Sequence, residues 1–395
     1  MSIEFGVGIS SLAEVFAAGQ EAANQMVSQL GTQLPDLILV FSSIRFANPR
    51  LLKGIRSVAG HAPLIGCTDA GGISAGGVQR HGVTVIGLAA KGAQFFTGVG
   101  RNLSRDPVAA GEHLARDLFK QTLEKPVALL TFPDGLAPDG AAILMGFQKV
   151  FGPDLPVVGG NAADDFYFQK TFQYFDNEVL TDSAPAALFC GDILVGVGVR
   201  HGWAPLGRPR RVTRSAGHVI YQLDKRPAVS IYEDYLGLKR ESLEEPLAHT
   251  AIIYPLGTAV AGREEYLLRE AVRVGHDGSL ICTGSLPVGC QVRLMIGGYA
   301  SVLEAAQQAT LSAVETIGRE RLKGALTFCN VARQKMLGSE CQDEISIIQD
   351  AMGGECARLG GFYTYGELAP LPLHRGRHKF QNTFHNESVV VMALG

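Results

Sequence analysis

The sequence predicts a mixed α/β (α+β) fold in two domains, each with mixed sheets that contain hairpins and are flanked by helices. The chain has 395 residues, more than one ordinary core holds. Hydrophobic residues make up 46% and charged residues 18%, a composition typical of a globular chain with a well-buried interior. Short apolar runs separated by helical patterns alternate with adjacent strands, which favours mixed sheets over a purely parallel one.

The first half shows its elements in order. Short apolar runs bounded by turn residues predict buried strands at 37–41, 63–67, 127–132 and 156–159. Apolar residues at helical spacing predict helices at 49–58, 107–122 and 137–150. Residues 82–89 and 93–100 flank a Lys-Gly turn and predict a β-hairpin. Strands return at 186–190 and 193–200.

Residues 201–215 change in character, since they hold the only Trp, two prolines and four arginines. We place the domain boundary here and expect domains at 1–205 and 206–395. The second half predicts helices at 227–236, 301–318 and 344–352. It predicts strands at 250–254, 265–274, 291–296, 325–330, 361–365 and 388–394.

Composition excludes several classes. The formal net charge is −3 without a block of like charges, so the chain lacks the basic face of a nucleic-acid binder. No apolar run is long enough to span a bilayer, and the N-terminus lacks the pattern of a signal peptide. Seven scattered cysteines without a C-x-x-C pair indicate buried reduced thiols. We therefore expect a cytoplasmic protein with no membrane or nucleic-acid partner.

Catalytic motifs fail on their context, so we expect no enzyme. Residues 72–76 match G-x-S-x-G, but a strand pattern follows where a nucleophile elbow needs a helix, so Ser74 would not be presented. Phosphate-loop and metal-binding signatures are absent, and the G-V-G runs at 6–8 and 196–198 lack the third glycine of a dinucleotide fingerprint. His374 and His378 lie among prolines and glycine and indicate a solvated loop.

One pattern occurs three times. Residues 64–74, 157–166 and 359–368 each end an apolar strand in glycine and continue into a polar turn. These corners would either line one pocket or form three ordinary tight turns.

The chain also resembles a known family over nearly its whole length. The motifs that carry the likeness are Trp203–Gly207, Thr213–Ser215, Val219–Asp224, Ile231–Gly237, Tyr254–Gly257, Asp277–Leu280, Phe362–Pro370, Phe384–Asn386, Ile65–Thr68 and Gly159–Ala162. They resemble those of proteins with a FIST N-terminal and a FIST C-terminal domain. The resemblance implies a sensory, signal-transducing module that binds a small ligand.

A stand-alone FIST protein of this size resembles the NosP type of nitric-oxide-sensing haem protein. That likeness implies haem b as cofactor and nitric oxide as ligand. It also implies a partner histidine kinase of a two-component system or a cyclic-di-GMP signalling enzyme. The oligomeric state stays open, with a homodimer as one alternative.

Haem needs an apolar slot and an axial ligand, most often an imidazole. Of the ten histidines, His249 opens the predicted strand AHTAIIYPLG, which leads into a motif of the resemblance. We expect His249 to bind the iron, with Tyr254 or a backbone carbonyl orienting its ring. Pro255 and Leu256 would complete the cofactor-binding segment, and His218 and His385 are the reserve ligands.

Two other classes remain open. A FIST sensor for a small metabolite such as an amino acid would use Asp69, Arg214 and Glu367 to hold its ligand. An enzyme would use Ser74 or Cys67. The absorption spectrum separates them, because only a haem protein is coloured.

Overall fold

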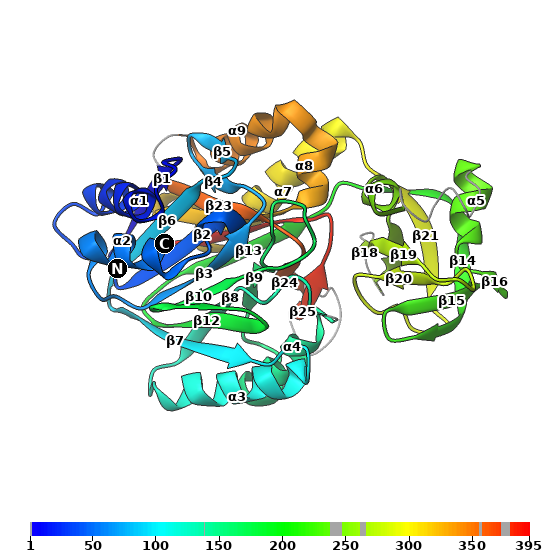
Figure 1. The fold of residues 1–395 in the computed structure, drawn as a ribbon, viewed down its shortest axis with the longest axis horizontal. Helices are drawn as coiled ribbons and strands as arrows, with labels where there is room; N and C mark the ends of the chain where they lie inside the picture. The colour runs from blue at the N-terminus through cyan, green and yellow to red at the C-terminus, as the bar shows by residue number, and fades with distance from the viewer. Residues whose placement is uncertain (1, 138, 238–246, 261–265, 355–357, 373–379) are drawn as a thin grey trace.

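The computed structural model describes residues 2–137, 139–237, 247–260, 266–354, 358–372 and 380–395. Within them, three six-stranded sheets form one body and an eight-stranded sheet stands beside it (Figure 1). Each six-stranded sheet joins one parallel strand pair to antiparallel neighbours. The predicted fold class, mixed sheets with hairpins and flanking helices, is confirmed.

The body consists of three units with the same order of elements, except that unit 3 has two helices where units 1 and 2 have one between the middle strands. Unit 1 contains β1 (Ser2–Ser10), α1 (Val15–Gln29), β2 (Leu37–Ser43), α2 (Pro49–Ala59), β3 (Leu64–Asp69) and β6 (Val83–Lys91). Unit 2 contains β7 (Ala93–Arg101), α3 (Pro107–Lys120), β8 (Pro126–Thr131), α4 (Ala142–Phe151), β9 (Val157–Gly160) and β12 (Ser183–Gly191). Unit 3 contains β13 (Val195–Arg200), α7 (Tyr299–Ile317), β22 (Gly324–Asn330), α8 (Val331–Leu337), α9 (Cys341–Met352), β23 (Arg358–Thr364) and β26 (Val389–Leu394).

Strand order repeats with the elements: β1-β6-β2-β3, β7-β12-β8-β9 and β13-β26-β22-β23. The helices cover the outer faces, with α1 and α2, α3 and α4, and α7 and α9 on three different sides of the body (Figure 1).

Hairpins join the units in a ring. The hairpin β4 (Gly72–Ser74) and β5 (Gly77–Gln79) follows β3 but pairs with β23. The hairpin β10 (Gln173–Phe175) and β11 (Glu178–Leu180) follows β9 but pairs with β3. The hairpin β24 (Glu367–Pro372) and β25 (Phe380–His385) follows β23 but pairs with β9. Each unit therefore completes the sheet of another.

Aromatic rings fill the centre where the inner faces meet. Phe41 on β2, Phe328 on β22 and Phe132 directly after β8 are fully buried. Ring centroids are 5.0 Å apart for Phe41 and Phe132 and 5.9 Å apart for Phe132 and Phe328, both edge to face. Burial of such rings is a main source of core stability.

The eight-stranded sheet is an insertion in unit 3, between β13 and α7. Its strands are β14 (Ala204–Ala216), β15 (Val219–Leu223), β16 (Arg226–Pro227), β17 (Leu256–Ala259), β18 (Tyr266–Arg269), β19 (Ala271–Val274), β20 (Leu280–Cys282) and β21 (Gln291–Ile296). The same segment of the chain also forms the short helices α5 (Ser230–Leu236) and α6 (Leu247–Ile253). We call residues 204–296 the inserted sheet. In units 1 and 2 a few residues make the same connection, from β1 to α1 and from β7 to α3.

Three expectations are wrong. Residues 82–89 and 93–100 form strands but no hairpin, because β6 pairs with β1 and β2 whereas β7 pairs with β12. Residues 250–254 lie mostly in helix α6 and not in a strand, since a short apolar run does not distinguish the two. The strand expected at 265–274 is divided at Glu270 into β18 and β19.

The expected boundary at 205/206 coincides with the start of the inserted sheet. Residues 2–200 form the first part of the body, and residues 299–394 complete it, because β26 pairs with β13. The division of the chain into two packed domains at 1–205 and 206–395 stays a prediction. Among the described helices, none is long and apolar enough to cross a membrane.

Candidate functional site

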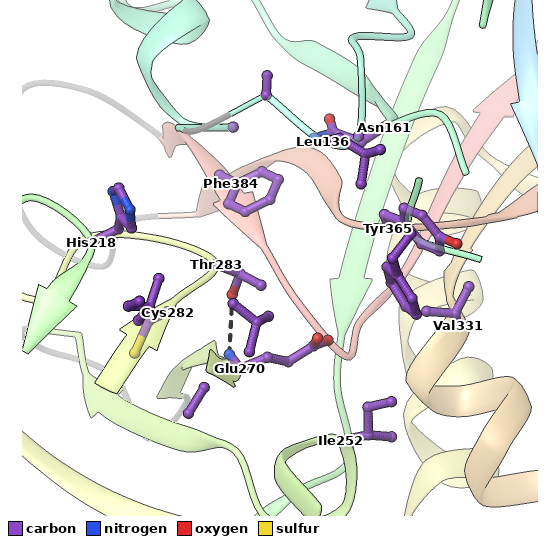
Figure 2. A pocket seen from close by; sticks show the side chains of 17 residues that line it. Leu136, Asn161, His218, Ile252, Glu270, Cys282, Thr283, Val331, Tyr365 and Phe384 are labelled. Carbon is purple, nitrogen blue, oxygen red and sulfur yellow. Dashed lines mark hydrogen bonds between the residues drawn. The ribbon is translucent and has the colours of Figure 1, made fainter. Parts of the chain in front are cut away.

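A cavity of about 430 Å³ lies between the inserted sheet and the body. Its described lining residues are Gly135, Leu136, Ala137, Gly140, Asn161, Phe168, His218, Ile252, Glu270, Ala271, Val272, Ile281, Cys282, Thr283, Val331, Tyr365 and Phe384. Figure 2 shows Cys282, Glu270 and Ile252 on the inserted side and Asn161, Tyr365 and Val331 on the body side. The walls are mainly apolar, with a few polar groups, as ligand cavities usually are.

Glu270 owes its position to the break between β18 and β19. Its backbone N–H donates to Thr283 Oγ1 at 3.0 Å, outside the regular ladder (Figure 2). The hydroxyl of Thr283 in turn donates to Asn386 Oδ1 on the body at 2.9 Å. The strand end that carries Glu270 is therefore tied to the turn after β25.

Glu270 faces a second buried carboxyl, that of Glu387 in this turn. Burial raises the pKa of Glu270 to about 7, while its interaction with Glu387 lowers it. Burial also raises the pKa of Glu387 well above the usual range, with the Glu270 and Glu367 charges adding to the effect and Arg269 opposing it. Two carboxyls that share a dry site hold a proton between them near neutral pH.

Several buried polar atoms here lack a hydrogen-bond partner of standard geometry among the described residues. They are Glu270 Oε1, both carboxyl oxygens of Glu387, Asn161 Oδ1, Asn386 Nδ2 and Arg269 Nε. Native proteins leave few such atoms, because an unpaired buried polar group costs about 1–3 kcal/mol. Two of these atoms, Glu270 Oε1 and Asn161 Oδ1, belong to residues that line the cavity, one on each wall.

The junction between the inserted sheet and the body is narrow. Trp203, the only tryptophan, is buried and donates from Nε1 to Ile253 O at 3.2 Å. The connecting segments pass through Gly202, at φ +92°, and Gly297, where a Cβ would come within 2.6 Å of the Trp203 ring. Neither glycine tolerates a side chain, so the junction requires close backbone approach.

Arg333 holds both connecting segments from the body. Its guanidinium donates to His201 O at 2.6 Å before the inserted sheet and to Val302 O at 2.7 Å after it. It also pairs with Glu344 at 2.6 Å, and both side chains are fully buried. The arginine therefore holds both connecting segments to the body at His201 and Val302. Any movement of the inserted sheet would have to occur between these two points and the sheet.

A second, more polar groove of about 480 Å³ lies elsewhere on the body, where Arg80, His81, Asp165, Gln334 and Lys335 contribute to its lining. His81 Nδ1 lies 3.7 Å from Asp165 Oδ1, and its side chain is 59% exposed. The groove lacks the apolar walls of the cavity, so we regard the cavity as the main candidate site.

The expectation that His249, Tyr254, Pro255 and Leu256 bind haem stays a prediction. His249 lies on helix α6, and its side chain is outside the described part of the chain. Tyr254 accepts a hydrogen bond from Tyr232 on its carbonyl at 3.0 Å, and Pro255 and Leu256 are buried in the inserted sheet. None of these residues is among the described lining residues.

The two reserve histidines differ. His218 lies on the turn between β14 and β15, is half-buried and lines the cavity (Figure 2). His385 is buried near Ala369 O, with Nε2 at 3.3 Å, and borders a separate small cleft. The structure therefore favours His218 over His385 as a ligand to anything bound in the cavity.

The residues expected to hold a metabolite also lie apart from the cavity. Glu367 is buried in a network with Asn330 and Ser388, and burial raises its pKa to about 8. Asp69 is buried at the corner after β3, where it accepts from the backbone of Gly71.

Arg214 stacks over the Tyr221 ring, with 4.6 Å between the guanidinium carbon and the ring centroid. It is exposed on β14 and is not among the described lining residues.

The residues expected for catalysis are enclosed. Ser74 ends β4, accepts from the Gly76 N–H and leads into hairpin strand β5 without a helix. Burial raises the pKa of the Cys67 thiol well above its usual range, which suppresses the reactive thiolate.

Sequence reasoning missed the acidic pair and its neighbours. Two signals were present: Arg269 and Glu270 interrupt an otherwise apolar run, and Asn386 and Glu387 precede a buried strand. Neither signal says that the two segments meet.

The fold combines a three-unit body with an inserted sheet, and a cavity lies between them. Residues 36–226 match the FIST N domain and residues 228–370 match the FIST C domain. The chain therefore belongs to the FIST-domain proteins, and this membership indicates a sensory or signalling role.

Relatives span the same length. An uncharacterized protein of Mycobacterium tuberculosis is 26% identical over 387 residues, covering 96% of this chain and 98% of its own. One of Mycobacterium bovis is 27% identical over 398 residues, with 96% and 97% covered. A Methanocaldococcus jannaschii protein is 36% identical over 93 residues, which are 24% of this chain and 18% of its own.

Solved structures show weak likeness. A cyanuric acid hydrolase described as an innovation by structural concatenation aligns over 100% of both chains, at 7% identity and a TM-score of 0.36. The A. caulinodans enzyme covers 48% of this chain and 71% of its own, at 9% identity and a TM-score of 0.29. These values are too low to bear on catalysis, so the absence of enzymatic activity stays a prediction.

Proposed function

We propose that the protein senses a small molecule that binds in the cavity between the inserted sheet and the body. One observation carries the proposal: the cavity takes its walls from both parts, and buried polar atoms on both sides lack partners. A ligand that contacts both walls binds the closed arrangement more tightly than an open one. Its binding then shifts the population toward the closed arrangement.

The junction suits this role. Glycines at both connecting segments permit backbone rotation, and Arg333 fixes their bases. The inserted sheet would present a changed surface to a partner, for which a histidine kinase or a cyclic-di-GMP signalling enzyme is our proposal from the family.

The two expected ligand classes fit unequally. A small metabolite such as an amino acid fits the size and mixed polarity of the cavity, although the residues expected to hold it lie elsewhere. Haem b fits in part, since His218 and apolar side chains line the wall and the imidazole would hold the iron. Its propionates would find Glu270 and no Lys or Arg among the described lining residues.

Haem b therefore remains the second candidate, favoured by His218 alone. The group would supply a binding place for a diatomic gas such as nitric oxide. The test is to add haem b to the purified protein and to His218→Ala, His249→Ala and the exposed-site control His276→Ala. A Soret band that only His218→Ala alters would support haem here, and no band in any protein would exclude it.

The sensor proposal is tested with cavity-filling variants. Val272 and Val288 are both exposed residues of the insertion, at 44% and 60%, but of the two only Val272 is among the described residues that line the cavity. We expect small aromatic probes to raise the Tm of the wild type and of Val288→Trp, but not of Val272→Trp. They should also change the fluorescence of Trp203 at the junction. If Val272→Trp responds as the wild type does, the cavity is not the binding site.

A further inference from the structure

The charge of the cavity wall is one-sided. Among the described lining residues, Glu270 carries the only carboxyl group, and none is a lysine or arginine. Apart from its contact with Glu387, its buried Oε1 has no hydrogen-bond partner among the described residues, and Asn161 Oδ1 on the opposite wall has none. An ionised Glu270 and the Asn161 side-chain carbonyl are both acceptors, so a ligand with N–H donors suits the polar groups of the cavity.

The neighbouring Glu387 is a second buried carboxyl that lacks hydrogen-bond donors. It is fully buried at φ +53°, and neither carboxyl oxygen has a partner of standard geometry among the described residues. The nearby Arg269 compensates incompletely, because its Nη1 donates to Leu268 O at 2.7 Å and Phe384 O at 3.2 Å. A buried carboxylate whose charge is only partly neutralised lowers the stability of the folded protein, and a bound cation would remove this loss.

We infer that the ligand carries a protonated amine on an apolar body, with the ammonium group against Glu270. This inference rests on the proposed sensor function and names its ligand class. The ammonium donates to the Glu270 carboxylate, and the apolar body packs against Ile252, Val331 and Phe384. A ligand carboxylate would meet Glu270 and find no lysine or arginine among the described lining residues, so an amine is preferred to a zwitterion.

The arrangement also explains how an amine would be sensed. Glu270 belongs to the inserted sheet and Glu387 to the body, so the proton that the two carboxyls share links the two parts, and full ionisation of both would replace that link by repulsion. An ammonium beside them replaces the repulsion by attraction and displaces the shared proton. Amine binding therefore favours the closed arrangement and releases protons near neutral pH.

Three probes of nearly equal shape test the inference by calorimetry: 2-phenylethylamine, the neutral 2-phenylethanol and the zwitterion L-phenylalanine. We expect the amine to bind about tenfold to a hundredfold more tightly than the other two, as a charge-assisted hydrogen bond implies. Glu270→Gln should remove that preference and leave alcohol binding unchanged. Glu304→Gln, on the exposed side of α7, is the matched control and should behave as the wild type.

Proton release gives a second readout. At pH 6.5 the heat of amine binding to the wild type should depend on the ionisation enthalpy of the buffer, and Glu270→Gln should reduce this dependence.

Equal affinity for amine and alcohol, with no effect of Glu270→Gln, would overturn the amine inference while leaving the sensor proposal in place. The sensor proposal would instead be overturned if Glu270→Gln bound none of the three probes while Val272→Trp still bound them.

Discussion

The buried acid pair makes stability depend on pH in a direction opposite to that of ordinary salt-bridged carboxylates. The pKa of Glu270 is about 7 in the folded protein, against 4.5 for an unperturbed glutamate. Between these values the folded state binds more protons than the unfolded state, so stability falls as pH rises. The loss of stability caused by ionisation of Glu270 is absent below about pH 4.5 and complete above about pH 7.

Its size follows from the two pKa values. Their difference corresponds to about 3 kcal/mol, at 1.36 kcal/mol for each unit of pKa. Glu270→Gln keeps the shape of the side chain and cannot ionise. We therefore expect the variant to exceed the wild type by about 3 kcal/mol in free energy of unfolding at pH 8, relative to their difference at pH 4.5.

The measurement is urea unfolding at pH 4.5, 6, 7 and 8, followed by the fluorescence of Trp203, which reports on the junction itself. Glu304→Gln serves as control and should follow the wild type at every pH. If Glu270→Gln and the wild type differ by the same amount at pH 4.5 and pH 8, Glu270 does not titrate as argued and the buried pair is not the source of the pH dependence.

Two further predictions concern the body. Gly159→Ala would place a Cβ 1.9 Å from Thr131 O, so we expect the free energy of unfolding in urea to fall by more than about 2 kcal/mol. Gly76→Ala, whose Cβ would lie an ordinary 3.6 Å from Ser74 Oγ, should cost much less, and equal losses would contradict the close approach. Arg333→Met leaves Glu344 buried without its ion-pair partner and should lower the free energy of unfolding by about 3–5 kcal/mol. Adding Glu344→Gln should recover part of this loss. A double variant as unstable as Arg333→Met would contradict the importance of the ion pair.

The elements of the body could be predicted because their signals are local. The strand at 37–41 is an apolar run, and the helix at 49–58 repeats apolar residues at helical spacing, so both appear as β2 and α2. The insertion was harder. In α6 a short apolar run follows Pro246, and such a run fits a helix as well as a strand.

The three-unit arrangement could not be predicted from local patterns, because each hairpin pairs with a strand distant in the chain. Its traces were nevertheless present. G-V-G occurs at 6–8, 98–100 and 196–198, once on the first strand of each unit. We compared two of these runs with a dinucleotide fingerprint, but their role is packing: a Cβ at Gly8 would lie 1.8 Å from Ala22 O of α1.

The three glycine-ended corners were noticed in the sequence, and the structure brings them together. Ala163 N–H donates to Thr68 O at 2.8 Å, and Ala70 N–H donates to Tyr363 O at 3.1 Å. The corners divide between two hollows: Asn161 lines the cavity, whereas Ala70 lines the second groove. One pocket for all three was thus too simple.

The candidate site arises where the threefold pattern is broken. The residues His81, Asp182 and Glu387 occupy equivalent turns before the last strand of each unit, all with φ between +50° and +56°. His81 is exposed, and Asp182 accepts from Ser104 at the surface, as befits polar side chains at open turns.

Only in unit 3 does an inserted sheet cover this turn and bury the carboxyl of Glu387 against Glu270. Without the insertion, Glu387 would lose the charge of Glu270, which together with burial and Glu367 raises its pKa. The insertion also supplies one wall of the cavity, so under the proposed function the carboxyl pair would couple ligand binding to the position of the inserted sheet.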